Sequence, residues 1–237
     1  MIEVYSWATP NGHKVHIMLE ECGLPYKAIP VDIGTGAQFQ QDFLKISPNN
    51  KIPAIIDPEG PDGAPISLFE SGAILLYLAG KTGKLLPADT RGKYEVLQWL
   101  NWQMGGLGPM AGQANHFNMY APQFNPVDKL EYGQQRYSNE VNRLFGVLNK
   151  RLADREFIAG AYSIADMASW PWVVGFKNFG QKLDDFPNLK RWFEKSVGER
   201  PAVVKGKAVG LELRAQPGIN TDEQRKILFG QTAQVVR

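Results

Sequence analysis

Cys22 is the only cysteine among the 237 residues, and it limits the thiol chemistry that the chain can do. A single cysteine excludes both an intramolecular disulfide and a Cys-x-x-Cys redox pair. Cys22 also follows Val15, Met18 and Leu19 at helical spacing, so we expect a buried, unreactive thiol on an apolar stripe. Any thiol chemistry beyond Cys22 therefore needs a thiol that another molecule brings.

The three histidines do not suggest a metal site. His13 and His16 are three residues apart and share one face of a helix, but no third ligand lies near them in sequence. Surface positions are expected for both, and an ordinary polar role is expected for His116. The glycines between residues 105 and 108 lack the strand-to-helix setting of a phosphate loop, so a nucleotide site is not expected either.

The first 86 residues alternate short apolar strands with amphipathic helices. Strands are expected at residues 2–5, 26–32, 51–57 and 66–69, with one helix between Asn11 and Gly23 and another over residues 72–82, capped by Ser71. The turn-rich residues 58–63 indicate an antiparallel hairpin, and Pro30 indicates an edge strand because proline cannot donate to a sheet. This βαβ-ββα order is the plan of a thioredoxin-like α/β fold.

A thioredoxin-like fold would place Pro53 beside the start of the first helix, and we predict a cis Ile52–Pro53 bond there. The backbone N–H and C=O of Ile52 would then pair with an extended peptide, as another strand would. Glu70 and Ser71 stand where a strand passes into a helix, whose unpaired N–H groups suit a carboxylate. A small peptide is the expected guest, and a plain helix cap is the alternative for Ser71.

From about residue 91 the strand pattern gives way to long helical segments with bulky tryptophan and leucine positions. Glycines between residues 105 and 108 interrupt the first of these segments, and residues 163–166 form a capping box that starts a buried helix. We therefore predict a thioredoxin-like domain at residues 1–86 and an all-helical bundle domain at residues 91–210. Residues 211–237 are expected to be a C-terminal tail packed on the body.

Charge and hydropathy exclude several kinds of partner. The net charge of +2 is too small, and the lysines and arginines too dispersed, for a nucleic-acid-binding face. The N-terminus lacks an export signal, and no apolar run approaches the ~20 residues that cross a bilayer. We expect a cytoplasmic protein that binds neither nucleic acid nor a membrane.

Three N-terminal stretches together resemble the glutathione site of glutathione transferases. They are residues 9–14 (TPNGHK), 47–54 (SPNNKIPA) and 69–75 (FESGAIL). The pattern is most similar to the nu class of bacterial glutathione-dependent disulfide-bond oxidoreductases, and a related pattern occurs in the fungal nitrogen-regulator prion protein. The similarity continues through residues 98–117, 136–137, 149–152, 163–172 and 227–233, so it covers essentially the whole chain.

The resemblance implies how each part of glutathione would be held. Ser71 and its helix N-terminus would bind the γ-glutamyl carboxylate, and Glu70 would bind the ligand's amino group. The cysteinyl backbone would pair with Ile52, just before Pro53. These four residues form the core of the implied site.

Three further residues complete the implied site. Gln38 matches a family position that contacts the tripeptide, and Lys51 would reach the glycyl carboxylate. Arg136 matches an arginine that crosses a dimer interface to the other subunit's ligand. The resemblance therefore implies a homodimer in which each site needs two chains.

The residue that activates the thiol in this family is normally Tyr, Ser or Cys near the start of the first helix. Tyr5 and Ser6 come too early for that role, and Cys22 lies on the apolar stripe. Thr9 and Asn11 occupy the activating positions, as they do in the nu class. The resemblance implies that both donate to the thiolate of glutathione, assisted by the positive end of the following helix.

The sequence thus predicts a glutathione-dependent disulfide-bond oxidoreductase that uses bound glutathione as its thiol. Alternatives with the same thiol site are transfer of glutathione to a hydrophobic electrophile, thiolytic ether cleavage and peroxidase activity. A non-catalytic glutathione-fold carrier or regulator is the alternative from another class, because the usual Tyr, Ser or Cys is missing. Against that alternative stand the complete glutathione-holding set and the lack of a Gln/Asn-rich N-terminal extension.

Overall fold

The chain divides into two compact units in this computed structural model, which describes residues 1–213 and 221–233. The first unit comprises residues 1–78 and the described part of 205–237, and the second comprises residues 79–204. The tail predicted at residues 211–237 includes two stretches, 214–220 and 234–237, that lie outside the described residues. Among the described helices, none has the length and apolar character needed to span a membrane.

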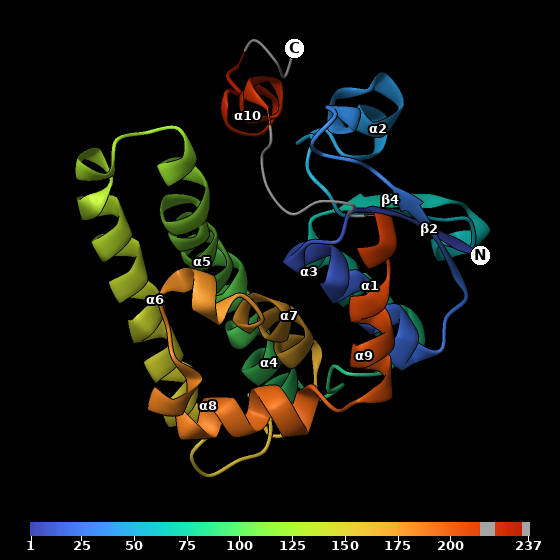
Figure 1. The fold of residues 1–237 in the computed structure, drawn as a ribbon. Coiled ribbons are helices and arrows are strands. Elements are labelled where there is room, and N and C mark those ends of the chain that lie inside the picture. The colour runs from blue at the N-terminus through green and yellow to red at the C-terminus, as the bar shows by residue number, and fades with distance from the viewer. Residues whose placement is uncertain (214–220, 234–237) are drawn as a thin grey trace. The chain divides into compact units, whose positions relative to one another are not determined.

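A four-stranded mixed sheet forms the centre of the first unit (Figure 1). Its strands are β1 (Ile2–Ser6), β2 (Tyr26–Pro30), β3 (Ala54–Asp57) and β4 (Ile66–Phe69), in the order β2-β1-β3-β4. β1 pairs in parallel with β2 and antiparallel with β3, and β3 pairs antiparallel with β4. The predicted βαβ-ββα order is confirmed, and the strand that contains Pro30 lies at an edge of the sheet, as predicted.

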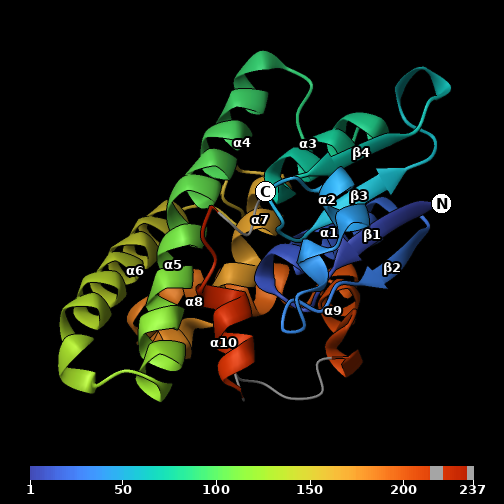
Figure 2. The ribbon, with the colours of Figure 1, turned by 90° about the horizontal axis from the view of Figure 1, so that it is seen from above.

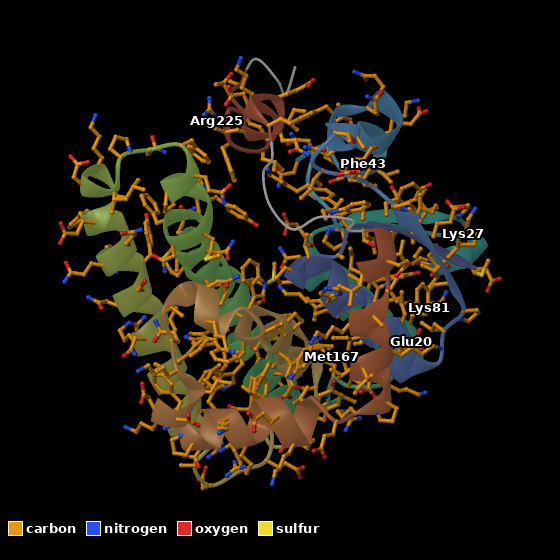
Figure 3. The ribbon with its side chains drawn as sticks, viewed as in Figure 1. Glu20, Lys27, Phe43, Lys81, Met167 and Arg225 are labelled. Carbon is orange, nitrogen blue, oxygen red and sulfur yellow. The ribbon has the colours of Figure 1, made fainter. Side chains whose placement is uncertain are left out.

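Helices cover both faces of this sheet. α1 (Pro10–Cys22) and α3 (Ser71–Thr82) lie on one face, and α2 (Gln41–Ile46) lies on the other (Figure 1). Phe43 points from α2 toward the sheet (Figure 3) and belongs to a small core with Val31 and Ala54. α3 begins at Ser71 itself, so Ser71 lies in the first helical turn and does not precede it as the sequence suggested.

Helix α9 (Pro201–Ala208) packs on α1 although it comes from the far end of the sequence. A Cβ added to Gly206 would lie 2.6 Å from the α1 backbone, and Lys205 Nζ lies 2.7 Å from an oxygen of Glu20, which Figure 3 labels. His16 is buried, because its Nε2 shares a hydrogen bond with Ser6 and its ring lies against the ring of Tyr26 in β2, while Gly206 of α9 lies against its backbone. The predicted surface position of His16 is therefore wrong, since the sequence of α1 does not reveal these contacts.

The second unit is built mainly from helices. They are α4 (Thr90–Trp102), α5 (Gly108–Asn115), α6 (Glu131–Arg151), α7 (Ile164–Val173) and α8 (Pro187–Arg191). α5 and α6 lie side by side in both ribbon views (Figures 1 and 2). A π-helical turn at Gln103–Leu107 separates α4 from α5, where the glycines predicted an interruption.

Helix α7 starts at the capping box that the sequence predicted. Ser163 Oγ accepts a hydrogen bond from Ala165 N at 3.3 Å, and Asp166 Oδ2 accepts one from Ser163 N at 3.1 Å. Asp166 is fully buried, and its Oδ1 accepts from Ile158 N at 3.0 Å and from Trp192 Nε1 at 2.9 Å. One carboxylate therefore ties the start of α7 to two other segments of the helical unit.

Candidate active site

The register of the sheet brings the three stretches that resemble a glutathione site to one end of the first unit. Tyr5 of β1 pairs with Ala54 of β3, and Ala54 pairs with Phe69 of β4. Three segments therefore meet at the same end of the strands. They are the segment that leads from β1 into α1, the residues before β3, and the residues after β4. Each of the three stretches contributes a different kind of group there.

The residues before β3 offer backbone groups. The Ile52–Pro53 peptide bond is cis, as predicted. The ladder between β3 and β4 begins at Ala54, so the peptide groups of Ile52 stand outside it. The Ser47 hydroxyl donates to the Lys51 carbonyl oxygen at 2.7 Å, which closes the loop on itself just before Ile52.

The junction of β4 and α3 combines an exposed carboxylate with a buried hydroxyl. Glu70 has a left-handed backbone, with φ of 69°, and Ser71 follows it in the first turn of α3. Lys14 of α1 is only 1% exposed, and its Nζ donates to Ser71 Oγ at 3.3 Å. Burial lowers the pKa of Lys14 to about 7, and the Glu70 carboxylate opposes that shift.

Lys14 is a candidate functional residue that the sequence reasoning missed. It belongs to the stretch at residues 9–14 that carried the resemblance, but no role was assigned to it there. One signal was available, because Lys14 lies one helical turn before Met18 and therefore on the apolar stripe of α1.

The start of α1 offers hydrogen-bond donors and a positive helix end. Thr9 caps the helix, because its Oγ1 accepts from Gly12 N at 3.4 Å, and its hydroxyl donates to the Trp7 carbonyl oxygen at 3.4 Å. Asn11 is half-buried in the first turn, and that turn contains no acidic residue. The positive potential at this helix end is therefore not cancelled by its own side chains, which suits a negatively charged sulfur.

The side chains that could supply a reactive group of their own are engaged elsewhere or buried. The Tyr5 hydroxyl donates to Glu3 Oε2 at 2.9 Å, and burial together with Glu3 raises the pKa of Tyr5. Ser6 Oγ shares a 2.8 Å hydrogen bond with His16 Nε2. Cys22 is the last residue of α1 and is 8% exposed. Among the described residues, no group of three His, Cys, Asp or Glu side chains could hold a metal ion.

Gln38 presents an unsatisfied acceptor. Its side chain is buried, and its Nε2 donates to the Ile33 carbonyl oxygen at 3.2 Å. Its Oε1 is also buried and has no hydrogen-bond partner among the described residues. Because a buried polar atom without a partner costs stability, this oxygen suits a donor that a ligand brings.

The described part of the C-terminal segment contacts Lys51 and its neighbour. Helix α10 (Asp222–Phe229) is followed by Gln231, whose Oε1 accepts from Lys51 Nζ at 3.2 Å and from Asn50 Nδ2 at 3.3 Å. Ile227 of α10 lies close to Gly36, two residues before Gln38. The segment therefore packs beside two of the residues that the resemblance assigned to glutathione.

Arg136 lies in the second unit, on α6. Its side chain is 53% exposed, and its Nη1 is 3.9 Å from Glu140 Oε2. Glu140 forms a closer ion pair with Arg143, at 2.7 Å. The guanidinium of Arg136 is therefore only weakly held within its own chain.

Comparison with known families decides what kind of protein carries this site. The profile of the glutathione S-transferase N-terminal domain matches residues 1–80, and that of the C-terminal domain matches residues 110–199. The chain belongs to the glutathione S-transferase family. The family resemblance inferred from the sequence is confirmed.

Two relatives of this glutathione S-transferase come from Escherichia coli. Disulfide-bond oxidoreductase YfcG is 52% identical over 220 residues, which cover 92% of this chain and 97% of YfcG. Disulfide-bond oxidoreductase YghU is 43% identical over 222 residues, which cover 88% of this chain and 74% of YghU.

Solved structures of similar proteins contain glutathione. A glutathione transferase from Pseudomonas putida, with one glutathione disulfide bound per subunit, matches with a TM-score of 0.82 and 45% identity, covering 88% of this chain and 91% of the other. A family member from Pseudomonas fluorescens, with two glutathione bound, matches with a TM-score of 0.81 and 48% identity, covering 87% and 92%. These likenesses confirm the predicted fold class of this glutathione S-transferase.

Proposed function

We propose that this member of the glutathione S-transferase family is a disulfide-bond oxidoreductase that uses bound glutathione as its thiol. The observation that carries the proposal is the contrast between the two ends of α1. Thr9 and Asn11 stand at its start, whereas Cys22, the one cysteine of the chain, is buried at its other end. The names of YfcG and YghU support disulfide chemistry, and the glutathione in solved relatives supports glutathione as the source of the thiol.

The first unit offers a suitable group for each part of the tripeptide. Ser71 and the first N–H groups of α3 suit the γ-glutamyl carboxylate, and the exposed carboxylate of Glu70 suits the ammonium group. The peptide groups of Ile52, just before Pro53, suit the cysteinyl backbone, because they stand outside the sheet ladder.

Two side chains outside that core complete the proposed binding set. The buried Oε1 of Gln38 suits a peptide N–H. The ammonium of Lys51, which donates to Gln231, suits the glycyl carboxylate.

Thr9 and Asn11 would act on the sulfur. Hydrogen bonds from these residues and the positive end of α1 would lower the pKa of the bound thiol and so raise the population of the reactive thiolate. The Thr9 hydroxyl donates to the Trp7 carbonyl oxygen across a long 3.4 Å contact. Exchange of this weak bond for one to sulfur would cost little.

The proposed reaction is balanced without a protein thiol. Two glutathione thiols and one substrate disulfide give one oxidised glutathione and two substrate thiols, so two electrons and two protons pass to the substrate. The chain's own contribution is to hold the tripeptide through Glu70, Ser71 and Ile52 and to stabilise negative charge at the sulfur. Each S–S bond that breaks is matched by one that forms.

The test is glutathione-dependent reduction of a small synthetic disulfide, run beside conjugation of glutathione to an aryl halide. We expect reduction that saturates with glutathione and is much faster than conjugation. Faster conjugation than reduction would instead indicate a transferase. Tight glutathione binding with neither activity would indicate a carrier or regulator, and the proposal would then be wrong.

We also infer that the working form is a homodimer in which Arg136 reaches the glutathione of the neighbouring subunit. The exposed guanidinium, 3.9 Å from Glu140, supports this role because arginine suits bidentate recognition of a carboxylate. The inference requires that isolated monomers bind glutathione more weakly than dimers do.

An Arg136→Gln variant is expected to raise the KM for glutathione about 10-fold and to change kcat less than about 2-fold, because a binding contact is lost. Arg143→Gln is the matched control, since Arg143 pairs with the same Glu140 on the same helix. Steady-state kinetics and sedimentation measure both variants. An unchanged KM in a dimeric Arg136→Gln variant, or a monomeric wild type, would contradict the inference.

We propose that the protein works in the cytoplasm. The reaction consumes reduced glutathione, and the cytosol is the compartment in which thiols are kept reduced. A chain with one buried cysteine also needs no oxidising environment for a disulfide of its own.

A further inference from the structure

Lys14 is an ionisable side chain in the interior of the first unit, and lysines are rarely buried in folded proteins. Its side chain is 1% exposed on α1, among core residues such as Met18. Burial lowers its pKa from 10.5 to about 7, while Glu70 opposes the shift. Because the folded-state pKa is the lower one, the contribution of Lys14 to stability falls as the pH drops from about 10.5 to about 7. A buried lysine whose ammonium group contacts a residue of the candidate site is a candidate for a functional role.

The hydrogen bond from Lys14 determines what Ser71 can do. Lys14 Nζ donates to Ser71 Oγ at 3.3 Å, and α1 and α3 share one face of the sheet (Figure 1). A hydroxyl has one donor proton and two acceptor lone pairs, so accepting from Lys14 does not use the proton of Ser71. When Lys14 is protonated, its charge behind the oxygen strengthens a hydrogen bond that Ser71 makes to an anion.

The position of Ser71 indicates which group of a ligand it would contact. Ser71 lies in the first turn of α3, a helix of 12 residues whose N-terminal N–H groups attract anions. Glu70, immediately before it, is exposed and would attract a ligand ammonium. A ligand group that carries both a carboxylate and an ammonium would match Ser71 and Glu70.

We propose that Lys14 is a positioning residue for the γ-glutamyl carboxylate of glutathione. From the interior it donates to Ser71 Oγ, and when protonated it adds positive charge behind the start of α3, where the carboxylate would bind. The inference rests on the proposed function, because it takes glutathione as the ligand. The inference also names a source of ligand selectivity, since Lys14 would favour thiol peptides that carry a carboxylate at the end bound by Ser71.

The test compares two ligands by isothermal titration calorimetry. One is glutathione, and the other is the same peptide made with 4-aminobutanoic acid, which lacks the α-carboxylate of the γ-glutamyl residue. The variant is Lys14→Met, which keeps most of the length of the side chain and removes the charge and the hydrogen-bond donor. Lys45→Met is the matched control, because Lys45 is exposed on α2 and pairs only with Asp42 among the described residues.

Lys14→Met is expected to raise the Kd of glutathione about 10-fold or more, because the charge and the hydrogen bond that support Ser71 at the carboxylate are lost. The analogue should bind weakly to wild type, and its Kd should change less than about 2-fold in the variant. Lys45→Met should bind both ligands as wild type does. The Tm of Lys14→Met should be no lower than that of wild type, since a buried charge is removed.

An unchanged Kd for glutathione in Lys14→Met would overturn the inference, as would an equal loss for both ligands. If Lys14→Met does not fold, Lys14→Gln tests the loss of the charge alone with a polar side chain, and the same difference between the two ligands is expected. A wild type that binds no glutathione would overturn the proposed function, and that result is visible before any variant is compared. Failure of the inference and failure of the function are therefore distinguishable.

Discussion

An Asn11→Ala variant is expected to reduce disulfides with a kcat/KM about 10- to 100-fold below that of wild type. Asn11 stands in the first turn of α1, beside the Thr9 cap, and its amide would donate to the sulfur of the thiolate. Loss of this donor would lower the population of the thiolate, and a hydrogen bond to a charged group is worth about 1.5–3 kcal/mol, which corresponds to about 10- to 100-fold in rate. The pKa of the bound glutathione thiol should rise in the same variant, and thiolate absorbance in the ultraviolet measures it.

The free energy of unfolding should change by less than about 1 kcal/mol in Asn11→Ala, because the side chain is only half-buried. Asn101→Ala is the matched control, since Asn101 is exposed and donates to the Leu97 carbonyl oxygen of its own helix at 2.8 Å. We expect wild-type kinetics from that control. Unchanged kcat/KM and an unchanged thiol pKa in Asn11→Ala would remove Asn11 from the mechanism.

An Asp166→Ala variant is expected to lose about 3–5 kcal/mol of unfolding free energy. The fully buried carboxylate accepts hydrogen bonds from Ile158 N, Ser163 N and Trp192 Nε1, at 3.0, 3.1 and 2.9 Å. Without Asp166 all three donors would be buried and unpaired, and each such group costs about 1–3 kcal/mol. Urea unfolding followed by tryptophan fluorescence measures the loss.

Asp154→Ala is the control for that loss, because Asp154 is exposed and pairs with its neighbour Arg155. Its unfolding free energy should stay within about 0.5 kcal/mol of wild type. Asp166→Asn should fall between wild type and Asp166→Ala, because it keeps one acceptor oxygen. A loss below about 1 kcal/mol in Asp166→Ala would show that the carboxylate does not anchor α7.

Local signals explain why much of the fold could be predicted from the sequence. Pro30 marked an edge strand because proline lacks an N–H, and residues 58–63 marked a hairpin because their glycines and prolines form turns. The capping box of Ser163 and Asp166 has a fixed spacing, so the start of α7 was predictable to the residue. Each of these signals depends on residues only a few positions apart.

The parts that could not be predicted depend on contacts between distant segments. Lys14 meets Ser71 because α1 and α3 pack on the same face of the sheet, although 57 positions separate them. His16 is buried because its side chain packs on Ser6 and Tyr26 of the sheet and α9 returns to cover its backbone. Gln231 meets Lys51 across 180 positions. No periodicity in one segment reveals which other segment will cover it.

The central claim is that the reacting thiol belongs to glutathione and not to the protein. The most direct measurement is the kcat/KM for glutathione-dependent disulfide reduction by a Cys22→Ala variant, compared with wild type. Because Cys22 is 8% exposed at the end of α1 farthest from Thr9, its replacement should cost about 1 kcal/mol of packing and no catalytic group. We predict a kcat/KM within about 2-fold of wild type. Abolished reduction by a folded Cys22→Ala variant would contradict the account.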